Sequence, residues 1–279
     1  MTPTSAAQPA VQVRPAELPA AAAVKLSILM AVKNEGATLP ATLKILNALI
    51  EVPHEILIVY DDPDDTTVPV VRRFQERHPA VRLIHNTRGP GVVHALRAGI
   101  AEAAGEYVLI FAIDDTGPAL ALDQMLALMD RGCDLVSCTR YARGGRRLGG
   151  SLIGGLLSLV ANRLFCTLSG TALTDSTTGI KMMRRDRLQR LTLEASAGWA
   201  VALELSIKAQ LAGWRVGEVP IISIDRLFGG RSTFTLGAWL PEYFRWFVWG
   251  VAQCWRTGHR PQPVMTPLDL EDAASPAER

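Results

Sequence analysis

Apolar residues along this chain recur in continuous runs that have the length of β-strands. The runs are KLSILMAV (25–32), EILIVYD (55–61), VRLIHN (81–86), YVLIFAI (107–113) and DLVSCTR (134–140). Polar residues do not alternate with apolar ones inside these runs, so we expect strands that are covered on both faces.

Segments of helical length separate these runs, at 36–51, 66–78, 91–104 and 119–131. Strict alternation of strands and helices predicts an α/β fold with a mostly parallel sheet and right-handed crossovers. In such sheets, ligands bind beyond the carboxyl ends of the strands.

Polar residues follow each predicted strand. They are KNE (33–35), DDPDD (61–65), NTRGPG (86–91), DD (114–115) and TRY (139–141). One acidic strand end alone is more simply explained as a solvated cap. Five polar ends that meet at one edge of a sheet predict a ligand site.

Length and composition allow one large domain, or two at most, because the 279 residues are 48% apolar. Ala and Pro dominate the start of the chain, and Pro and charged residues dominate its end. We therefore expect a disordered tail at 1–24, the main domain at 25–235, an amphipathic aromatic helix at 236–258 and a second disordered tail at 259–279.

Charge and targeting signals narrow the class of protein. The net charge of +2 does not suggest a nucleic-acid binder. Pro9, Arg14, Glu17 and Pro19 interrupt any apolar core of a signal peptide, so we expect a cytoplasmic protein. No spanning helix is obvious, although 148–174 contains Arg163 as its only charge.

The four cysteines lack the spacing of metal ligands and stand in apolar surroundings: Cys133, Cys138, Cys166 and Cys254. Buried free thiols are therefore favoured over disulfides.

The acidic strand ends and a glycine-rich segment together suggest phosphate chemistry. Carboxylates without a His or Cys partner suit Mg²⁺ or Mn²⁺, which also grips the phosphates of a ligand. The segment RGPGVVHALRAG (88–99) allows a backbone to approach an anion at a helix N-terminus. No Gly-Lys-Ser/Thr follows, so ATP hydrolysis is not expected, and His94 is expected to be packed rather than catalytic.

The order of these motifs resembles a known family. The segments are LSILMAVKNEGATLPATL, EILIVYDDPDDTT, RGPGVVHALRAGIAEAAGEYVLIFAIDD, LVSCTRYARGG, ANRL, DSTTGIKMMRRDRL and DRLFGGRSTF, in unbroken order from 25 to 257. They are similar to the family 2 glycosyltransferases of GT-A fold, and more closely to the dolichol-phosphate mannose synthase branch.

The resemblance implies an inverting, metal-dependent transfer of a hexose from a GDP- or UDP-sugar to a polyprenyl phosphate, with Mg²⁺ or Mn²⁺ as the cofactor. Two alternatives stay open. One is a family 2 enzyme that acts on a soluble or other acceptor. The other is a catalytically impaired protein that binds sugar nucleotides.

Site residues follow from the resemblance position by position. The nucleotide-sugar positions are Ala31, Lys33, Asn34, Glu35, Asp61, Asp62, Arg88, Gly89, Gly91, Ala112, Ile113 and Asp114. Within this set, Glu35 and either Asp61 or Asp62 are implied to hold the base and ribose.

The remaining roles concern the metal and the acceptor. The implied metal ligands are Asp114, as the lead ligand, and the adjacent Asp115, as a stand-in for the missing first carboxylate of the motif. Arg140 and Ser158 are implied to hold the acceptor phosphate, a task that suits the permanently charged arginine fork. Arg226 and Ser232 match a loop that closes over phosphates.

Several positions depart from the family pattern. Ala31 and Lys33 replace a Pro and a Tyr, and Ala112 replaces the first Asp of the metal motif. Gly154 stands where an Arg is expected, so Arg146 and Arg147 are candidate replacements. The segment DRLFGGRSTF also carries an extra residue before its serine.

Glu204 has two interpretations: it lines the sugar site, or it is an ordinary helix glutamate.

The segment 239–256 holds four of the six tryptophans. At helical spacing its polar residues share one face, namely Glu242, Arg245, Gln253 and Arg256. Such a helix either lies in a membrane interface or packs on the domain's own core. The glycine-rich 148–169 is a second candidate for lipid contact. We expect a peripheral protein at the cytoplasmic membrane face, with a separate membrane-embedded partner as a further expectation.

Overall fold

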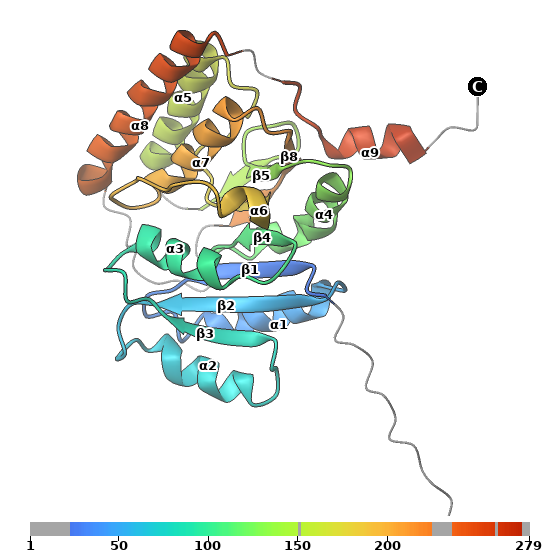
Figure 1. The fold of residues 1–279 in the computed structure, drawn as a ribbon, viewed down its shortest axis with the longest axis vertical. Helices are drawn as coiled ribbons and strands as arrows, with labels where there is room; N and C mark the ends of the chain where they lie inside the picture. Colours follow the sequence, from blue (N-terminus) through green and yellow to red (C-terminus); the bar gives the residue numbers. More distant parts are fainter. Residues whose placement is uncertain (1–22, 150–151, 225–235, 260–261, 275–279) are drawn as a thin grey trace, which may run out of the picture.

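A computed structural model of the chain describes residues 23–149, 152–224, 236–259 and 262–274. Its centre is a seven-stranded sheet of order β3-β2-β1-β4-β7-β5-β8 (Figure 1). The strands are β1 (Leu26–Ala31), β2 (His54–Tyr60), β3 (Val81–His85), β4 (Tyr107–Ile110), β5 (Leu135–Thr139), β7 (Lys181–Arg184) and β8 (Val216–Pro220). The five strands that the apolar runs predict are confirmed, whereas the patterns did not indicate β7 and β8.

Strand direction brings the predicted polar ends together. β1 pairs in parallel with β2 and β4, and β2 pairs in parallel with β3. β7 runs antiparallel to both β4 and β5, so β5 and its parallel neighbour β8 point the same way as β1. The mostly parallel sheet is therefore confirmed. A separate pair of short strands, β6 (Arg146–Leu148) and β9 (Ile222–Ile224), lies beside this edge.

Helices cover both faces of the sheet, which explains why the strands are apolar throughout. One core layer contains α1 (Leu39–Leu49), α2 (Thr67–Gln75), the 3-10 helix η1 (Gly117–Ala121) and α4 (Leu122–Asp130). The opposite layer contains α3 (Val92–Glu102), α5 (Leu152–Ser169), α6 (Arg185–Leu188), α7 (Ala200–Leu211) and α8 (Leu236–Thr257). Along β1, Ile28 and Met30 enter the first core and Leu29 enters the second.

α5 and α8 form the outermost part of the second layer. Each packs on the other, and α8 also packs on α7 (Figure 1). The rings of Phe165 and Phe247 meet edge to face between α5 and α8, with their centroids 5.3 Å apart.

The expected tail 259–279 differs from the structure in its described part. Met265 donates its N–H to the Val216 carbonyl at 3.0 Å and accepts from the Glu218 N–H at 2.9 Å. The helix α9 (Pro267–Ala274) follows and contacts α4. β8 is an edge strand, so this segment supplies partners for backbone groups that would otherwise be unpaired. The expected tail 1–24 lies outside the described residues up to position 22, as do Arg226 and Ser232.

A buried carboxylate joins the loop after β1 to the start of α2. Asp65 is 4% exposed. Its two oxygens accept from the backbone N–H of Asn34 at 3.0 Å and of Thr67 at 2.7 Å. Asn34 has a left-handed φ of 59°, which Asn adopts more readily than most residues other than glycine, and the bond from its N–H to Asp65 holds this turn in place.

We predict that Asp65→Ala destabilises the protein by about 1–3 kcal/mol, because it leaves the buried Thr67 N–H and the part-buried Asn34 N–H without their acceptor. Urea unfolding at neutral pH measures the loss. The matched control is Asp64→Ala, since Asp64 is its exposed neighbour. Equal midpoints for the two variants would contradict the role given to Asp65.

Candidate active site

The glycine-rich loop after β3 is held by an aspartate at the end of β2. Asp61 accepts from the Asn86 side-chain amide at 2.7 Å and from the Gly91 N–H at 2.7 Å. The same amide of Asn86, a buried residue, also donates to the Gly89 carbonyl at 2.7 Å. Gly89 and Gly91 have φ values of 122° and 106°, which a side chain would strain. Asp61 is thus occupied in shaping the loop.

The neighbouring candidates that follow β2 and β3 are more exposed. Asp62 is exposed, and its carboxylate accepts only from the N–H of Asp64 among the described residues, at 2.9 Å. Arg88 is also exposed, and its N–H donates to the Asn86 side chain at 3.0 Å. Of the two aspartates, Asp62 is therefore the one with a carboxylate available to a ligand.

The end of β1 places its candidates at the same edge. Ala31 is half-buried, and Lys33 and Asn34 are exposed. The Glu35 N–H donates to the Thr67 hydroxyl at 2.9 Å, which joins this turn to the start of α2.

The two adjacent aspartates after β4 have different surroundings. Asp115 accepts from the Ser223 hydroxyl at 2.5 Å and from the N–H groups of Ile224 and Gly117, each at 3.2 Å. Burial raises the pKa of Asp115 in spite of these bonds. Its carboxylate fastens β9 to the end of β4, and no described residue pairs with the half-buried carboxylate of Asp114.

The residues just before Asp114 hold it in place. The buried Ile113 presents its carbonyl to the Thr42 hydroxyl of α1 at 2.9 Å, and Ala112 is half-buried. Among the described residues, no three His, Cys, Asp or Glu side chains cluster as metal ligands. A single free carboxylate still fits Mg²⁺ or Mn²⁺, since such ions are often held by one or two carboxylates together with substrate phosphates and water.

The Arg140 guanidinium, after β5, is held in a two-point fork by Asp175. Arg140 Nε lies 2.7 Å from Asp175 Oδ2, and Nη2 lies 3.0 Å from Oδ1. Asp175 is fully buried. Burial opposes both charges, yet their mutual attraction raises the pKa of Arg140 and holds that of Asp175 below its usual range. The charge of the arginine is therefore permanent and its direction is fixed.

Ser158 reaches this arginine through a chain of hydroxyls. The Tyr141 hydroxyl donates to Ser158 Oγ at 2.8 Å, and Thr177 Oγ1 lies 3.5 Å from Ser158 Oγ. Arg140 Nη2 donates to Thr177 Oγ1 at 3.2 Å. The buried Asn162 also donates to that hydroxyl at 2.8 Å. The structure thus brings Arg140 and Ser158 into one polar network.

Two more ionisable side chains, those of Lys181 and Glu218, are buried near the pair of Arg140 and Asp175. Lys181 of β7 is 0% exposed and donates to Ser137 Oγ at 2.8 Å. Burial lowers its pKa to about 8, although Asp175 and Glu218 favour its charge. Glu218 of β8 is 4% exposed, and burial raises its pKa to about 7.

The structure also places three other candidates of the sequence analysis. Glu204 is 0% exposed and accepts from the Ala195 N–H at 2.8 Å, so it is a structural helix glutamate. His94 is half-buried beside Gly89, consistent with packing. A Cβ on Gly155 would lie 3.5 Å from Arg147 Nη1. Of the two candidate arginines, the structure therefore places Arg147 against the first turn of α5.

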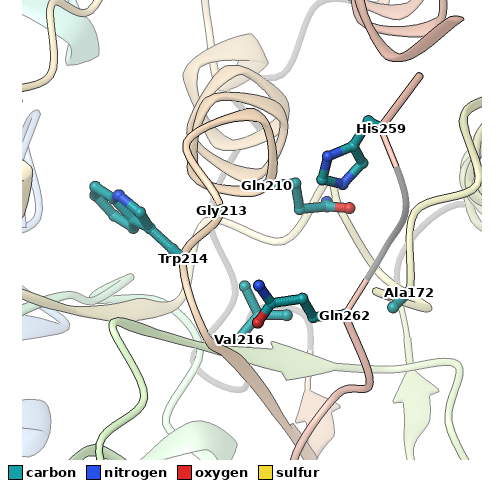
Figure 2. A pocket seen from close by; sticks show the side chains of 7 residues that line it. All are labelled: Ala172, Gln210, Gly213, Trp214, Val216, His259 and Gln262. Carbon is teal, nitrogen blue, oxygen red and sulfur yellow. The ribbon is translucent and has the colours of Figure 1, made fainter. Parts of the chain in front are cut away.

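A small cavity of about 10 Å³ lies away from the strand ends, between α7 and the segment after α8 (Figure 2). Its lining includes Gln210, Gln262 and His259, whose Nε2 is buried without a described partner. The space suits a single water. It therefore does not compete with the strand ends as a site for a nucleotide sugar.

Sequence reasoning assigned no roles to several residues that build the site. They are Asn86, Asn162, Asp175, Thr177, Lys181 and Glu218. Five of them lie inside the segments NTRGPG, ANRL and DSTTGIK, which carry the resemblance. Glu218 stands among apolar neighbours in VGEVP (216–220), and a charged residue in an apolar strand is a candidate for buried hydrogen bonds.

Comparison with known proteins supports the resemblance. Residues 27–192 match the model of the family described as glycosyl transferase family 2. The chain belongs to the family 2 glycosyltransferases. A dolichyl-phosphate hexose transferase of Haloferax volcanii is 27% identical to this enzyme over 70% of the chain and 81% of that protein. A dolichol-phosphate mannosyltransferase of Pyrococcus furiosus is 25% identical over 81% of the chain and 64% of that protein.

Solved structures confirm the GT-A fold of this glycosyltransferase. Glucosyl-3-phosphoglycerate synthase of Mycobacterium tuberculosis, solved with Mn²⁺, UDP and phosphoglyceric acid, superposes with a TM-score of 0.63 at 18% identity. That match covers 83% of this chain and 78% of the other. A mannosyltransferase of Pyrobaculum calidifontis, solved with GDP-Man and Mn²⁺, gives 0.55 at 20% identity over 83% and 64% of the two chains.

The buried Glu218 generates a prediction about pH and stability. Its pKa is about 7 in the folded protein, against an ordinary value of 4.5. Between these values the folded chain binds more protons than the unfolded chain, so the free energy of unfolding falls as the pH rises. We predict that the urea midpoint of the wild type falls relative to that of Glu218→Gln between pH 4.5 and 7.5. Glu51→Gln, at an exposed position, is the control, and parallel curves for the wild type and Glu218→Gln would contradict the raised pKa.

Proposed function

We propose that this glycosyltransferase moves a hexose from a GDP- or UDP-sugar to a polyprenyl phosphate. The observation that carries the proposal is the dual character of α5. This helix presents Ser158 to the site that contains Arg140, and it also carries a row of exposed apolar side chains. A phosphate attached to a long hydrocarbon chain requires both features in one place.

The donor half of the proposal rests on the ends of β1, β2, β3 and β4. The loop shaped by Asp61 and Asn86 offers a glycine backbone to a diphosphate. Asp62 and Glu35 are the proposed acceptors for base N–H and ribose hydroxyl groups. Asp114 is the proposed ligand of Mg²⁺ or Mn²⁺, and this ion would neutralise charge on the leaving diphosphate. Both solved relatives described above were captured with Mn²⁺ and a nucleotide.

The acceptor half rests on the end of β5 and on α5. Asp175 uses Nε and Nη2 of Arg140, so the other edge of the guanidinium is the part proposed to meet the acceptor phosphate. The Ser158 hydroxyl and Arg147 complete this proposed phosphate site, with Arg147 standing in for the arginine that Gly154 replaces. The two curated relatives carry names that specify dolichyl or dolichol phosphate.

The proposed reaction is a direct inverting displacement at the anomeric carbon. An oxygen of the acceptor phosphate forms the new bond while the bond to the nucleoside diphosphate breaks. That oxygen is already anionic at neutral pH, so no strong general base is needed. The chain contributes orientation, because Arg140 holds the incoming phosphate in line and its own direction is fixed by Asp175.

The surface beside this site is suited to a bilayer. On α5 the exposed apolar residues follow helical spacing: Leu156, Leu157, Val160, Leu164 and Leu168. α8, which packs on α5, adds Leu240, Phe244, Val248 and Trp255. We name these nine residues the apolar face. Exposed apolar surface of this extent is typical of an interaction site, and we propose that it contacts the membrane interface.

α8 packs on the domain's own core, which is one of the two interpretations of its sequence, and its exposed residues support the proposed membrane contact. Glu242 is 8% exposed and accepts from the Ser196 N–H at 2.8 Å and from the Trp246 indole at 3.1 Å. Its polar face therefore turns partly toward the protein, while the apolar face stays outside. In the part of the chain that the structure describes, we find no helix with the length and apolarity needed to span a bilayer.

The first prediction from this proposal concerns activity. Purified protein with Mn²⁺ or Mg²⁺, polyprenyl phosphate and a panel of GDP- and UDP-hexoses should yield a glycosyl-lipid. Arg140→Ala should abolish transfer and leave nucleotide binding nearly intact, whereas Asp114→Ala should weaken metal-dependent nucleotide binding. Asp123→Ala, at an exposed position on α4, is the control.

If the enzyme forms product with a soluble phosphorylated acceptor but none with polyprenyl phosphate, the protein is a family 2 enzyme that acts on a soluble acceptor. Metal-dependent nucleotide binding without transfer to any acceptor would favour the impaired sugar-nucleotide binder. Absence of both product and nucleotide binding would refute the donor site as well.

The second prediction concerns the membrane. Leu164→Glu combined with Phe244→Glu should lower flotation with vesicles of phosphatidylcholine and phosphatidylglycerol by at least about tenfold, because each buried apolar side chain contributes about 1.5–3 kcal/mol. Leu268→Glu on α9 is the control, since Leu268 is as exposed as Phe244 but lies outside the apolar face. Unchanged flotation of the double variant would exclude the apolar face as the contact.

A further inference from the structure

Glu218 fixes two successive peptide groups without reaching the site itself. Its Oε1 accepts from the Thr174 N–H at 2.7 Å and from the Asp175 N–H at 3.0 Å. Its Oε2 accepts from the Thr174 hydroxyl at 2.9 Å. The carboxyl group is buried, so no solvent can replace these bonds.

The second of these N–H groups belongs to Asp175, whose carboxylate holds the Arg140 guanidinium in a fixed direction. The Asp175 carboxylate makes the fork to the guanidinium, and its Oδ1 also accepts from the Thr178 N–H at 3.2 Å. Movement of the backbone at 174–175 would therefore displace both carboxylate oxygens of Asp175 relative to the Arg140 guanidinium.

We infer that Glu218 is a positioning residue of the transfer reaction: it fixes the backbone at 174–175, through which Asp175 orients the phosphate-holding Arg140. This inference rests on the proposed function, because the role of Arg140 does. Glu218 does not touch either substrate in this assignment.

Substitution of Glu218 can distinguish its role as a hydrogen-bond acceptor from the effect of its charge, because the hydroxyl groups beside it can reorient. Thr174 Oγ1 lies 2.6 Å from Thr139 Oγ1, and either hydroxyl can donate. In Glu218→Gln the amide oxygen can keep both N–H bonds, while its NH₂ group donates to a Thr174 hydroxyl that has turned. In Glu218→Ala both N–H groups lose their acceptor.

The test compares the full-length wild type with Glu218→Ala and Glu218→Gln, and uses Glu51→Ala as the control at an exposed site. For Glu218→Ala we expect kcat/KM for polyprenyl phosphate to fall on the order of 10-fold to 100-fold, as for residues that orient the ligands of a functional site. Nucleotide binding should stay unchanged. Glu218→Gln should stay within about threefold of the wild type, because its hydrogen bonds are preserved.

An NMR readout is independent of activity. The Arg140 Nε–H signal, assigned by its loss in Arg140→Lys, reports the bond to Asp175. It should shift or broaden in Glu218→Ala and persist in Glu218→Gln. If the alanine variant does not fold, Glu218→Asp, which withdraws the carboxylate by one methylene, serves in its place.

The outcomes separate the two levels of inference. If the wild type transfers to no acceptor while the Nε–H signal still depends on Glu218, the proposed function fails and the positioning contact stands. An unchanged Nε–H signal together with wild-type acceptor kinetics in Glu218→Ala would overturn the inference. Equal defects in Glu218→Gln and Glu218→Ala would also overturn it, because the charge would then be the essential property.

Discussion

The buried ion pair of Arg140 and Asp175 is the interaction on which the polar site after β5, the proposed acceptor side, depends. Side-chain exposures are 16% for the arginine and 0% for the aspartate. Removing two charges from water is costly, and it is tolerated only where geometry and further hydrogen bonds compensate. Thr177, the Thr178 N–H and the Arg140 N–H supply those bonds. The pair therefore holds the 175–178 segment at the end of β5, and Thr177 of that segment contacts Ser158 and Asn162 of α5.

Acidic residues at the strand ends divide into structural and available ones. Asp61, Asp65 and Asp115 each use both carboxylate oxygens on groups of the protein itself. They shape the glycine loop, the turn after β1 and the attachment of β9. Asp114 and Asp62 keep carboxylates that a ligand can reach. This arrangement places rigid support directly behind the few groups that are proposed to touch the donor, as electrostatic preorganisation requires.

α5 connects the chemistry to the surface. Phe165 enters the second core and packs against Phe247 of α8. Trp255 near the end of α8 donates to the Leu168 carbonyl at 2.5 Å and so ties the two helices together again. The inner side of this helix pair is thus held by ordinary core packing, and its exposed apolar face is the surface proposed to contact lipid.

Continuous apolar runs, helical spacing and turn residues by themselves determined the five parallel strands, the alternating helices and the edge at which the polar ends meet. These are short-range properties, because each depends on residues within one element. The resemblance also pointed to Arg140 and Ser158, which the structure brings into one site. Tertiary structure alone decided that β7 enters the sheet antiparallel and that Asp175 is the partner of Arg140. It also decided that Asp115 is engaged, whereas Asp114 has no partner among the described residues. The physical reason is that a buried polar group takes its partners from segments far apart in the chain. Sheet order and register, which no local pattern encodes, determine which of those segments come within hydrogen-bonding distance.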